Sequence, residues 1–194
     1  MKKILVINGH PVSGSYCEAL KNAYCAGAEK AGAEVSQINI ADLNFDPVLH
    51  YGYKIIQPLE EDLIQAQRSI EEADHIMIIF PVWWGGVPAV LKGFLDRTFV
   101  PTWAFSFPKG GCFQKKLLSG RSARIMMTMD NYPVIFRIFF GAPALRQIRD
   151  MTLKFCGIRP VKVNMMGSVR FSSERKREKW LLNAGKCGRR DALK

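Results

Sequence analysis

Short apolar runs alternate with amphipathic helical stripes along this chain, and that alternation limits its fold more than any other feature. The run from Ile4 to Ile7 is rich in β-branched residues, as expected of a strand buried on both faces. From Ser15 onward, apolar residues recur at helical spacing until Gly32. Strands that alternate with helices form parallel crossovers, which cover both faces of a sheet. We therefore predict a doubly wound, five-stranded parallel α/β fold.

Four more strands and four more helices follow the first pair. The expected strands are Glu34 to Ile40, His75 to Phe80, Arg124 to Met129 and Val161 to Gly167. The expected helices are Leu59 to Glu72, Pro88 to Phe99, Ala144 to Cys156 and Glu174 to Ala184. A chain of 194 residues fits one domain, so residues 1–194 are taken as a single unit.

The net charge of +11 is unevenly divided. Residues 1–108 hold 8 basic against 12 acidic side chains, whereas residues 109–194 hold 20 against 5. A basic half can attract nucleic acid, an anionic membrane or a phosphorylated cofactor, or it can be a solvated surface. We favour the solvated surface and expect no nucleic acid partner, because the chain lacks a nucleic-acid-binding signature.

The cysteines and histidines suggest a reduced protein without a metal. No C-x-x-C pair and no histidine pair at metal-binding spacing occurs, so neither a disulfide framework nor a zinc site is expected. No uncharged apolar run reaches the roughly 18 residues that span a bilayer. We expect a cytoplasmic protein without membrane insertion. The five cysteines are Cys17, Cys25, Cys112, Cys156 and Cys187.

The loop GHPVSGS, from Gly9 to Ser15, lies between the first strand and the first helix. A helix N-terminus presents unpaired N–H groups that suit a phosphate, and His10 adds a ring that can carry positive charge. The loop lacks the lysine of a nucleotide-binding P-loop. Ser15 and Glu18 also form the S-x-x-E capping box, so capping and phosphate binding both remain open.

Two tryptophans and two glycines follow the expected strand from His75 to Phe80. Trp83 and Trp84 sit where parallel sheets hold their ligands, and Gly85 and Gly86 let backbone amides approach a planar ring. The alternative is that both indoles pack beneath a neighbouring loop.

The segment PTWAFSF places Trp103, Phe105 and Phe107 at alternating positions. An extended conformation would put all three on one side, where they would line a flat pocket or an interface.

The segment from Thr128 to Pro133 follows the fourth strand. Its side chains Asp130, Asn131 and Tyr132 offer hydrogen bonds to a polar heterocycle, although the same residues also favour a plain turn.

Taken together, four stretches of the chain resemble the flavodoxin-like NAD(P)H:quinone oxidoreductases. The resemblance implies a sheet of order 2-1-3-4-5 and a noncovalent flavin at the carboxyl ends of the strands. FMN is preferred and FAD is possible, because nothing in the sequence clearly marks an adenine site. It also implies a homodimer with active sites at the interface. The stretches are KILVINGHP, FPVWWGGVPAVLKGFLDR, WAFSF and LKFCGIRP.

The family pattern also implies roles for individual residues. The flavin phosphate would be held by His10, Ser15, Tyr16 and Cys17. The flavin ring would contact Pro81, Val82, Trp83, Trp84 and Gly85, with Thr128, Met129 and Asp130 completing the cofactor site. The substrate pocket would include Trp103, Phe105 and Phe107, and the catalytic candidates are Asp130, Asn131 and Tyr132.

The activity implied is a two-step hydride transfer from NAD(P)H through the flavin to a quinone-like acceptor. The chain has Gly141, Ala142 and Pro143 where the family places an assisting histidine. An alternative is therefore a flavin-binding regulatory or ancillary subunit of a transport system. Arg137, Arg146 and Arg149 could bind the 2′-phosphate of NADPH or simply be surface charge.

Overall fold

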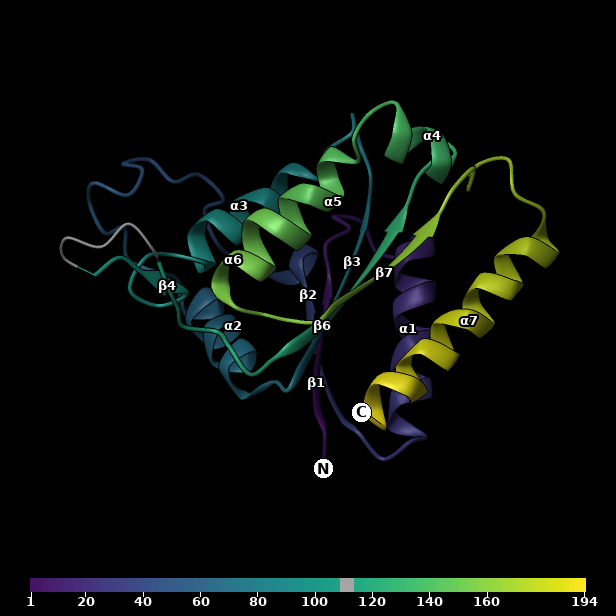
Figure 1. Ribbon diagram of the computed structural model, residues 1–194, viewed down its shortest axis with the longest axis horizontal. Coiled ribbons are helices and arrows are strands. Elements are labelled where there is room, and N and C mark those ends of the chain that lie inside the picture. The colour runs from purple at the N-terminus through teal and green to yellow at the C-terminus, as the bar shows by residue number, and fades with distance from the viewer. Residues whose placement is uncertain (109–113) are drawn as a thin grey trace.

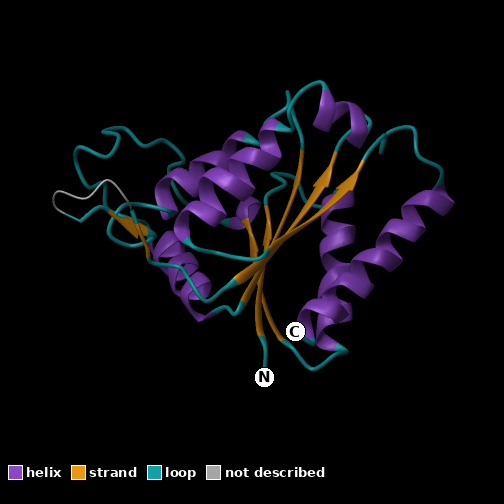
Figure 2. Ribbon diagram, in the orientation of Figure 1, coloured by secondary structure: helices purple, strands orange, loops and turns teal. Residues whose placement is uncertain are grey.

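The computed structural model describes residues 1–108 and 114–194. Within these ranges the main sheet has five parallel strands in the order β2-β1-β3-β6-β7. Figure 2 shows this sheet, in orange, between helices on both sides. The doubly wound α/β fold is confirmed. The predicted order 2-1-3-4-5 has the same topology, because β4 and β5 form a separate antiparallel pair. The strands are β1 Lys3–Asn8, β2 Glu34–Asn39, β3 His75–Pro81, β4 Phe105–Ser106, β5 Lys115–Lys116, β6 Ser122–Thr128 and β7 Val161–Met166.

Helices cover both faces of the sheet. In Figure 1, α1 and α7 lie on one face, and α2, α3 and the α5–α6 segment lie on the other. A π-helical turn, Arg149–Leu153, joins α5 to α6, and a 3-10 turn, Ile40–Asp42, follows β2. The helices are α1 Tyr16–Glu29, α2 Glu61–Glu72, α3 Ala89–Thr98, α4 Pro133–Ile138, α5 Pro143–Ile148, α6 Lys154–Cys156 and α7 Glu174–Ala192.

Helices α1 and α7 touch backbone to backbone through glycines. A Cβ atom at Gly27 would lie 2.0 Å from the carbonyl oxygen of Gly185, and one at Gly188 would lie 2.1 Å from that of Tyr24. No side chain fits there. The expected end of the last helix, at Ala184, was wrong for this reason: its glycines pack against α1 and do not end the helix.

Two further expectations need correction. Helix α4 was not expected, although Pro133 at its first position is a typical helix start. The helix expected from Ala144 to Cys156 is divided into α5, the π turn and α6. Before α5, Ala142 adopts a left-handed conformation with φ of +47°, which separates α5 from α4.

The parallel strands give the sheet two different edges. The carboxyl edge is formed by the strand ends at Asn8, Pro81, Thr128 and Met166. The amino edge is formed by the strand starts, and both chain ends lie near it (Figure 1). The loops of the two edges are therefore far apart, and each edge can be considered separately.

The amino edge contains a buried charge cluster centred on Asp191. Its carboxylate accepts hydrogen bonds from Arg124 at 2.9 Å, Lys162 at 2.8 Å and Tyr24 at 3.1 Å. His75 Nε2 lies 3.3 Å from the same carboxylate. Burial alone would raise the pKa of Asp191, but the hydrogen bonds from His75, Arg124 and Lys162 outweigh it and lower the pKa well below its ordinary value.

The described cysteines are all free and buried, and Cys112 lies outside the described residues. They are Cys17, Cys25, Cys156 and Cys187. Over residues 1–108 and 114–194, the structure holds no helix with the length and apolarity to cross a membrane. Among the same residues, no group of three or more His, Cys, Asp or Glu side chains could hold a metal ion.

Candidate functional site

The two tryptophans form part of a tight turn that is pinned at both ends. The amide of Trp83 donates to the carbonyl of Gly86 at 3.0 Å, and the amide of Gly86 donates back at 2.8 Å. Between them, Trp84 and Gly85 have φ values of +51° and +75°. Both central residues are thus left-handed, as in the mirror-image turns of β-hairpins. Glycine tolerates this conformation, whereas a tryptophan there is strained.

The indole of Trp84 is fully exposed, so it does not pack beneath a neighbouring loop. Trp83 is 45% exposed and meets the ring of His10 edge-on, with 5.7 Å between ring centroids. This contact joins the turn to the loop that precedes α1. The alternative of two packed indoles therefore fails for Trp84 and holds only in part for Trp83.

A cavity of about 470 Å³ opens beside this turn. It lies at the carboxyl edge, between the loop after β3 and the loop after β6. Of the predicted cofactor residues, Val82, Trp84, Gly85, Met129 and Asp130 line it, as does the catalytic candidate Asn131. Pro81 is buried and pairs with Thr128 in the sheet, so these two lie behind the cavity wall.

Three lining residues were missed by the sequence reasoning. Phe136 and Phe140 come from α4 and the turn after it, and Pro143 begins α5. The available signals were the two prolines at helix starts and the apolar run between them. The carbonyl of Gly85 accepts from the amide of Ala144 at 3.0 Å, which fixes the turn against α5.

The loop before α1 is held by its own side chains. His10 Nδ1 accepts from the amide of Val12 at 3.0 Å. Burial lowers the pKa of His10, although its contact with the Val12 backbone opposes this. The neutral ring is therefore favoured at neutral pH, although the sequence alone allowed either a neutral or a charged ring.

The capping interaction expected at α1 is present. The side chain of Ser15 accepts from the amide of Glu18 at 3.3 Å, and the carboxylate of Glu18 accepts from the amide of Gly14 at 2.6 Å. Glu18 thus places a negative charge within the loop that was predicted to hold a phosphate.

Tyr16 and Cys17 face different neighbours. The hydroxyl of Tyr16 donates to the carbonyl of Arg177 at 2.8 Å, and the thiol of Cys17 lies 3.3 Å from the hydroxyl of Thr128. Burial raises the pKa of Tyr16 to about 12 and that of Cys17 to about 11, so both remain protonated at neutral pH. The Cys17 contact brings the start of α1 against the end of β6.

The loop after β6 contains the three catalytic candidates. Asp130 accepts from the amide of Arg170 at 2.9 Å, and the side chain of Asn131 accepts from the amide of Tyr132 at 2.8 Å. These bonds support the turn interpretation. Asp130 and Asn131 also line the cavity, whereas Tyr132 is exposed and is not part of its lining.

The aromatic segment does not extend as expected. The chain turns at Thr102, whose φ is +73°, and Trp103 donates to the carboxylate of Glu71 at 2.5 Å. Phe105 and Phe107 contact each other, with 5.7 Å between ring centroids. None of the three aromatic residues lines the cavity beside Trp84. The expectation of one shared aromatic face was therefore wrong.

Comparisons with known proteins identify the family. The chain matches the family model described as "Flavodoxin-like fold" over residues 2–185. It therefore belongs to this flavodoxin-like family, which agrees with the topology of the sheet.

Individual relatives refine this result. The ribosyldihydronicotinamide dehydrogenase [quinone] of Mus musculus is 28% identical, over 91% of this chain and 86% of its own length. The structure of Smu.1420 from Streptococcus mutans UA159 superposes with a TM-score of 0.84 at 30% identity, covering 97% and 99% of the two chains. The NAD(P)H:quinone oxidoreductase of Methanothermobacter marburgensis shares the fold, with a TM-score of 0.80 at 21% identity, covering 97% and 98%.

Proposed function

We propose that this protein is a flavin-dependent NAD(P)H oxidoreductase that reduces a quinone-like acceptor. The observation that carries the proposal is the turn from Trp83 to Gly86, which holds a fully exposed indole beside a cavity at the carboxyl edge. Ligands of doubly wound folds bind at this edge. The names of the relatives, which are dehydrogenases and oxidoreductases acting on quinones, support the same chemistry.

The cavity fits the flavin ring. Its volume of about 470 Å³ lies within the range of small-molecule sites. Val82, Phe136 and Phe140 supply apolar contacts, while Asp130 and Asn131 supply polar atoms. Gly85 has no side chain to keep a planar ring away from the backbone. The ring would thus lie between the loop after β3 and the loop after β6.

The residues at the start of α1 suit the flavin phosphate less well than the cavity suits the flavin ring. The α1 N-terminus carries partial positive charge, and the hydroxyl of Ser15 lies beside it. The carboxylate of Glu18 opposes an anion at this point. We propose FMN, because the loop offers donors for one phosphate and nothing in the sequence marks an adenine site. His10 would contact the phosphate as a neutral ring.

A bound flavin would supply the hydride chemistry, accepting hydride from NAD(P)H and passing it to the acceptor in two successive steps. The protein would bind and orient the reactants and exclude water, chiefly through Phe136 and Phe140. Because Tyr16 and Cys17 stay protonated, neither is a base at neutral pH. Asp130, Asn131 and Tyr132 are the side chains proposed to hydrogen-bond the polar edge of the flavin or the acceptor.

We also propose a homodimer. Large apolar side chains stand exposed around the cavity, and a patch of this kind marks a protein interface. Trp103, Phe105 and Phe107 do not line the cavity of their own chain. We therefore propose that these residues of a second copy complete the substrate pocket. The exposed side chains are Trp84, Val134, Ile138, Phe139 and Phe140. The free cysteines favour a reducing compartment, and we propose the cytoplasm.

The second candidate is an ancillary subunit that binds flavin without turnover. Two features favour it: by the family resemblance, a histidine is expected where Ala142 and Pro143 stand, and the start of α7 exposes Arg175 and Lys179, which would suit an acidic partner. The two candidates differ in one property, because only the enzyme passes electrons to a small acceptor.

The test is anaerobic reduction of the FMN-loaded protein. We expect NADPH or NADH to bleach the flavin absorbance and a soluble quinone to restore it. Flavin binding without either change would favour the ancillary subunit, and failure to bind flavin would overturn both candidates.

A matched pair of variants tests whether flavin binds beside the turn from Trp83 to Gly86. Gly85→Val introduces a side chain at the cavity, whereas Gly120→Val introduces it at an exposed glycine of similar positive φ, with no atom within 4 Å. Flavin affinity should fall only in Gly85→Val. Equal losses in both variants would show that backbone strain alone is responsible.

A further inference from the structure

A second cavity, of about 360 Å³, opens at the amino edge of the sheet. It lies at the opposite edge from the proposed flavin site, beside the starts of β1, β3, β6 and β7. Its polar lining includes Lys2, Asp74, Ser122, Arg159, Lys162 and Lys194. The proposed oxidoreductase activity assigns no role to these residues, and of them only Arg159 falls within a stretch that carries the family resemblance, LKFCGIRP.

The charges around this cavity are predominantly positive. Arg124 forms a two-point pair with Asp191 and balances its charge, so Lys162 is in excess over the carboxylate it also contacts. Lys2 and Arg159 form no ion pair with any residue in the part of the chain that the structure describes. An oxyanion in this cavity would therefore meet two cations without an anion of their own, Lys2 and Arg159, and a third, Lys162, that Asp191 shares with Arg124.

The cavity also offers hydrogen-bond acceptors. His75 Nε2 lies 3.3 Å from the carboxylate of Asp191, and a proton on Nε2 would let Nδ1 accept from the hydroxyl of Ser122, 2.7 Å away. The oxygen of Ser122 can then accept from a ligand hydroxyl. The carboxylate of Asp74 accepts from the amide of Lys3 at 2.9 Å and has further lone pairs.

The shape of the lining limits the ligand further. Apart from the imidazole of His75, no aromatic ring lines this cavity among the described residues. The imidazole of His75 is buried, so a flat heterocycle such as nicotinamide or flavin would find no exposed aromatic ring in the described lining on which to stack. A polar ligand with hydroxyl groups and a phosphate matches what is present.

We propose that the amino-edge cavity binds a phosphorylated polyol or sugar. The phosphate would contact Lys2, Arg159 and Lys162, and the hydroxyl groups would donate to Ser122 and Asp74. Because the cavity lies against Asp191 and His75, its ligand would bind only the folded chain and would raise the thermal stability of the protein.

The test is calorimetric titration of the FMN-saturated protein with glycerol phosphate, so that FMN occupies any phosphate site before α1. Inorganic phosphate and glycerol, the two halves of the probe, are titrated separately at matched ionic strength. We expect glycerol phosphate to bind most tightly, phosphate more weakly and glycerol not at all. The same titrations on flavin-free protein keep this result independent of the proposed flavin chemistry.

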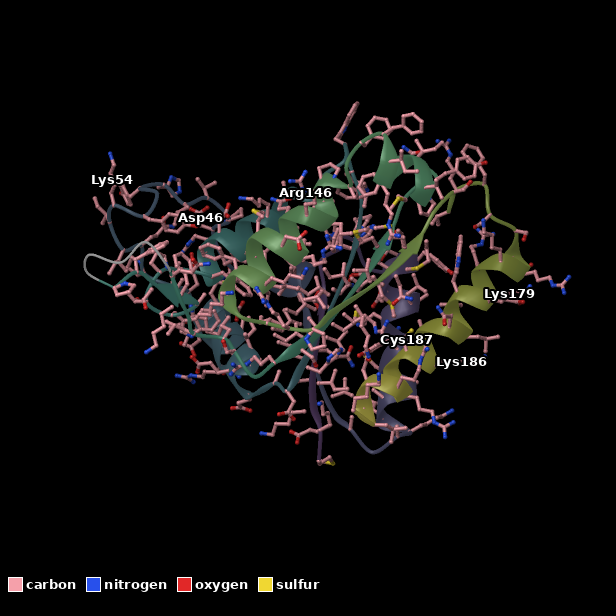
Figure 3. The ribbon with its side chains drawn as sticks, viewed as in Figure 1. Asp46, Lys54, Arg146, Lys179, Lys186 and Cys187 are labelled. Carbon is pink, nitrogen blue, oxygen red and sulfur yellow. The ribbon has the colours of Figure 1, made fainter. Side chains whose placement is uncertain are left out.

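Two substitutions assign the binding to the cavity. Arg159→Gln should weaken the binding of glycerol phosphate by about tenfold, the loss expected for one charge-assisted hydrogen bond. Lys179→Gln removes the same charge from the outer side of α7 (Figure 3) and should leave the affinity unchanged. Arg159 is exposed and lies outside the Asp191 cluster, so its substitution should leave the fold intact.

The absence of saturable binding by glycerol phosphate would overturn the proposal, as would equal losses in the two variants. A Ser122→Ala variant separates the two parts of the ligand. It should weaken binding of glycerol phosphate and leave that of inorganic phosphate unchanged, whereas equal weakening of both would contradict the assigned hydroxyl contact.

Discussion

The two edges of the sheet differ in how they hold groups that are energetically costly. At the amino edge, the carboxylate of Asp191 is buried and surrounded by donors from Arg124, Lys162 and Tyr24. At the carboxyl edge, the indole of Trp84 is fully exposed on a strained backbone, beside a cavity. The first arrangement contributes stability, and the second reduces it while presenting a binding surface.

This difference indicates why the proposed flavin site lies at the carboxyl edge. Strain and exposed aromatic surface are retained where a ligand or partner compensates for them. A buried charge cluster depends instead on its own members, because removing one of them leaves a charge without its partner. Substitutions at the two edges should therefore change different properties.

The largest expected effect is at the amino edge. Asp191→Asn should lower the free energy of unfolding by about 3–5 kcal/mol, because Arg124 and Lys162 lose their buried counter-charge. Denaturant unfolding measures this change. Asp150→Asn removes an aspartate that pairs with Arg149 and Lys154 on the surface, and it should cost about 1 kcal/mol or less. Equal losses would show that the burial of Asp191 has no special weight.

Acid should reveal the same cluster. The pKa of Asp191 is lowered in the folded protein, so its contribution to stability is fully present above the ordinary aspartate pKa of about 4 and is lost as the pH falls below it. Melting temperatures measured across this range should fall more steeply for the natural chain than for Asp191→Asn. Parallel curves would contradict this assignment.

At the carboxyl edge, stability and binding should move in opposite directions. Trp84→Gly should raise the free energy of unfolding by about 1 kcal/mol, because glycine accepts the left-handed conformation. The same change should weaken FMN binding by removing the exposed indole. Trp83→Gly is the matched control: it does not relieve a positive φ and should bring no gain in stability. Unchanged FMN affinity in Trp84→Gly would separate that side chain from the flavin site.

The smallest expected effect concerns Glu18. Glu18→Gln keeps an acceptor for the amide of Gly14 and removes the negative charge near the proposed phosphate position. FMN should bind about two- to fivefold more tightly, the usual size of a charge effect at a helix terminus. Glu29→Gln makes the same change at the other end of α1 and should not affect the affinity. Weaker binding by Glu18→Gln would show that the phosphate lies elsewhere.

Periodicity was sufficient to predict the fold because the strands buried on both faces are distinct in composition. The run that became β3 is apolar from Ile76 to Pro81, and the structure buries every residue of it. The order of the sheet came from the family resemblance. The ends of helices were harder to predict, since Gly185 and Gly188 look like stop signals unless their contact with α1 is known.

The candidate site was only partly accessible from the sequence. Loops that follow parallel strands meet at one edge, so Val82, Trp84 and Asp130 could be grouped from their positions alone. Phe140 and Pro143 line the cavity on either side of Ala142, whose backbone is left-handed. An alanine gives no sequence signal for this conformation. The turn at Thr102, whose φ is positive, likewise keeps Trp103 out of an extended segment with Phe105 and Phe107, and their place in a substrate pocket stays a prediction.

The most direct test of the account is a crystal structure of the protein grown with FMN. We predict that the flavin ring lies between the turn from Trp83 to Gly86 and the loop after β6, with its phosphate beside Ser15 at the start of α1. A structure in which FMN binds elsewhere, or in which saturating FMN leaves the carboxyl-edge cavity empty, would contradict the account.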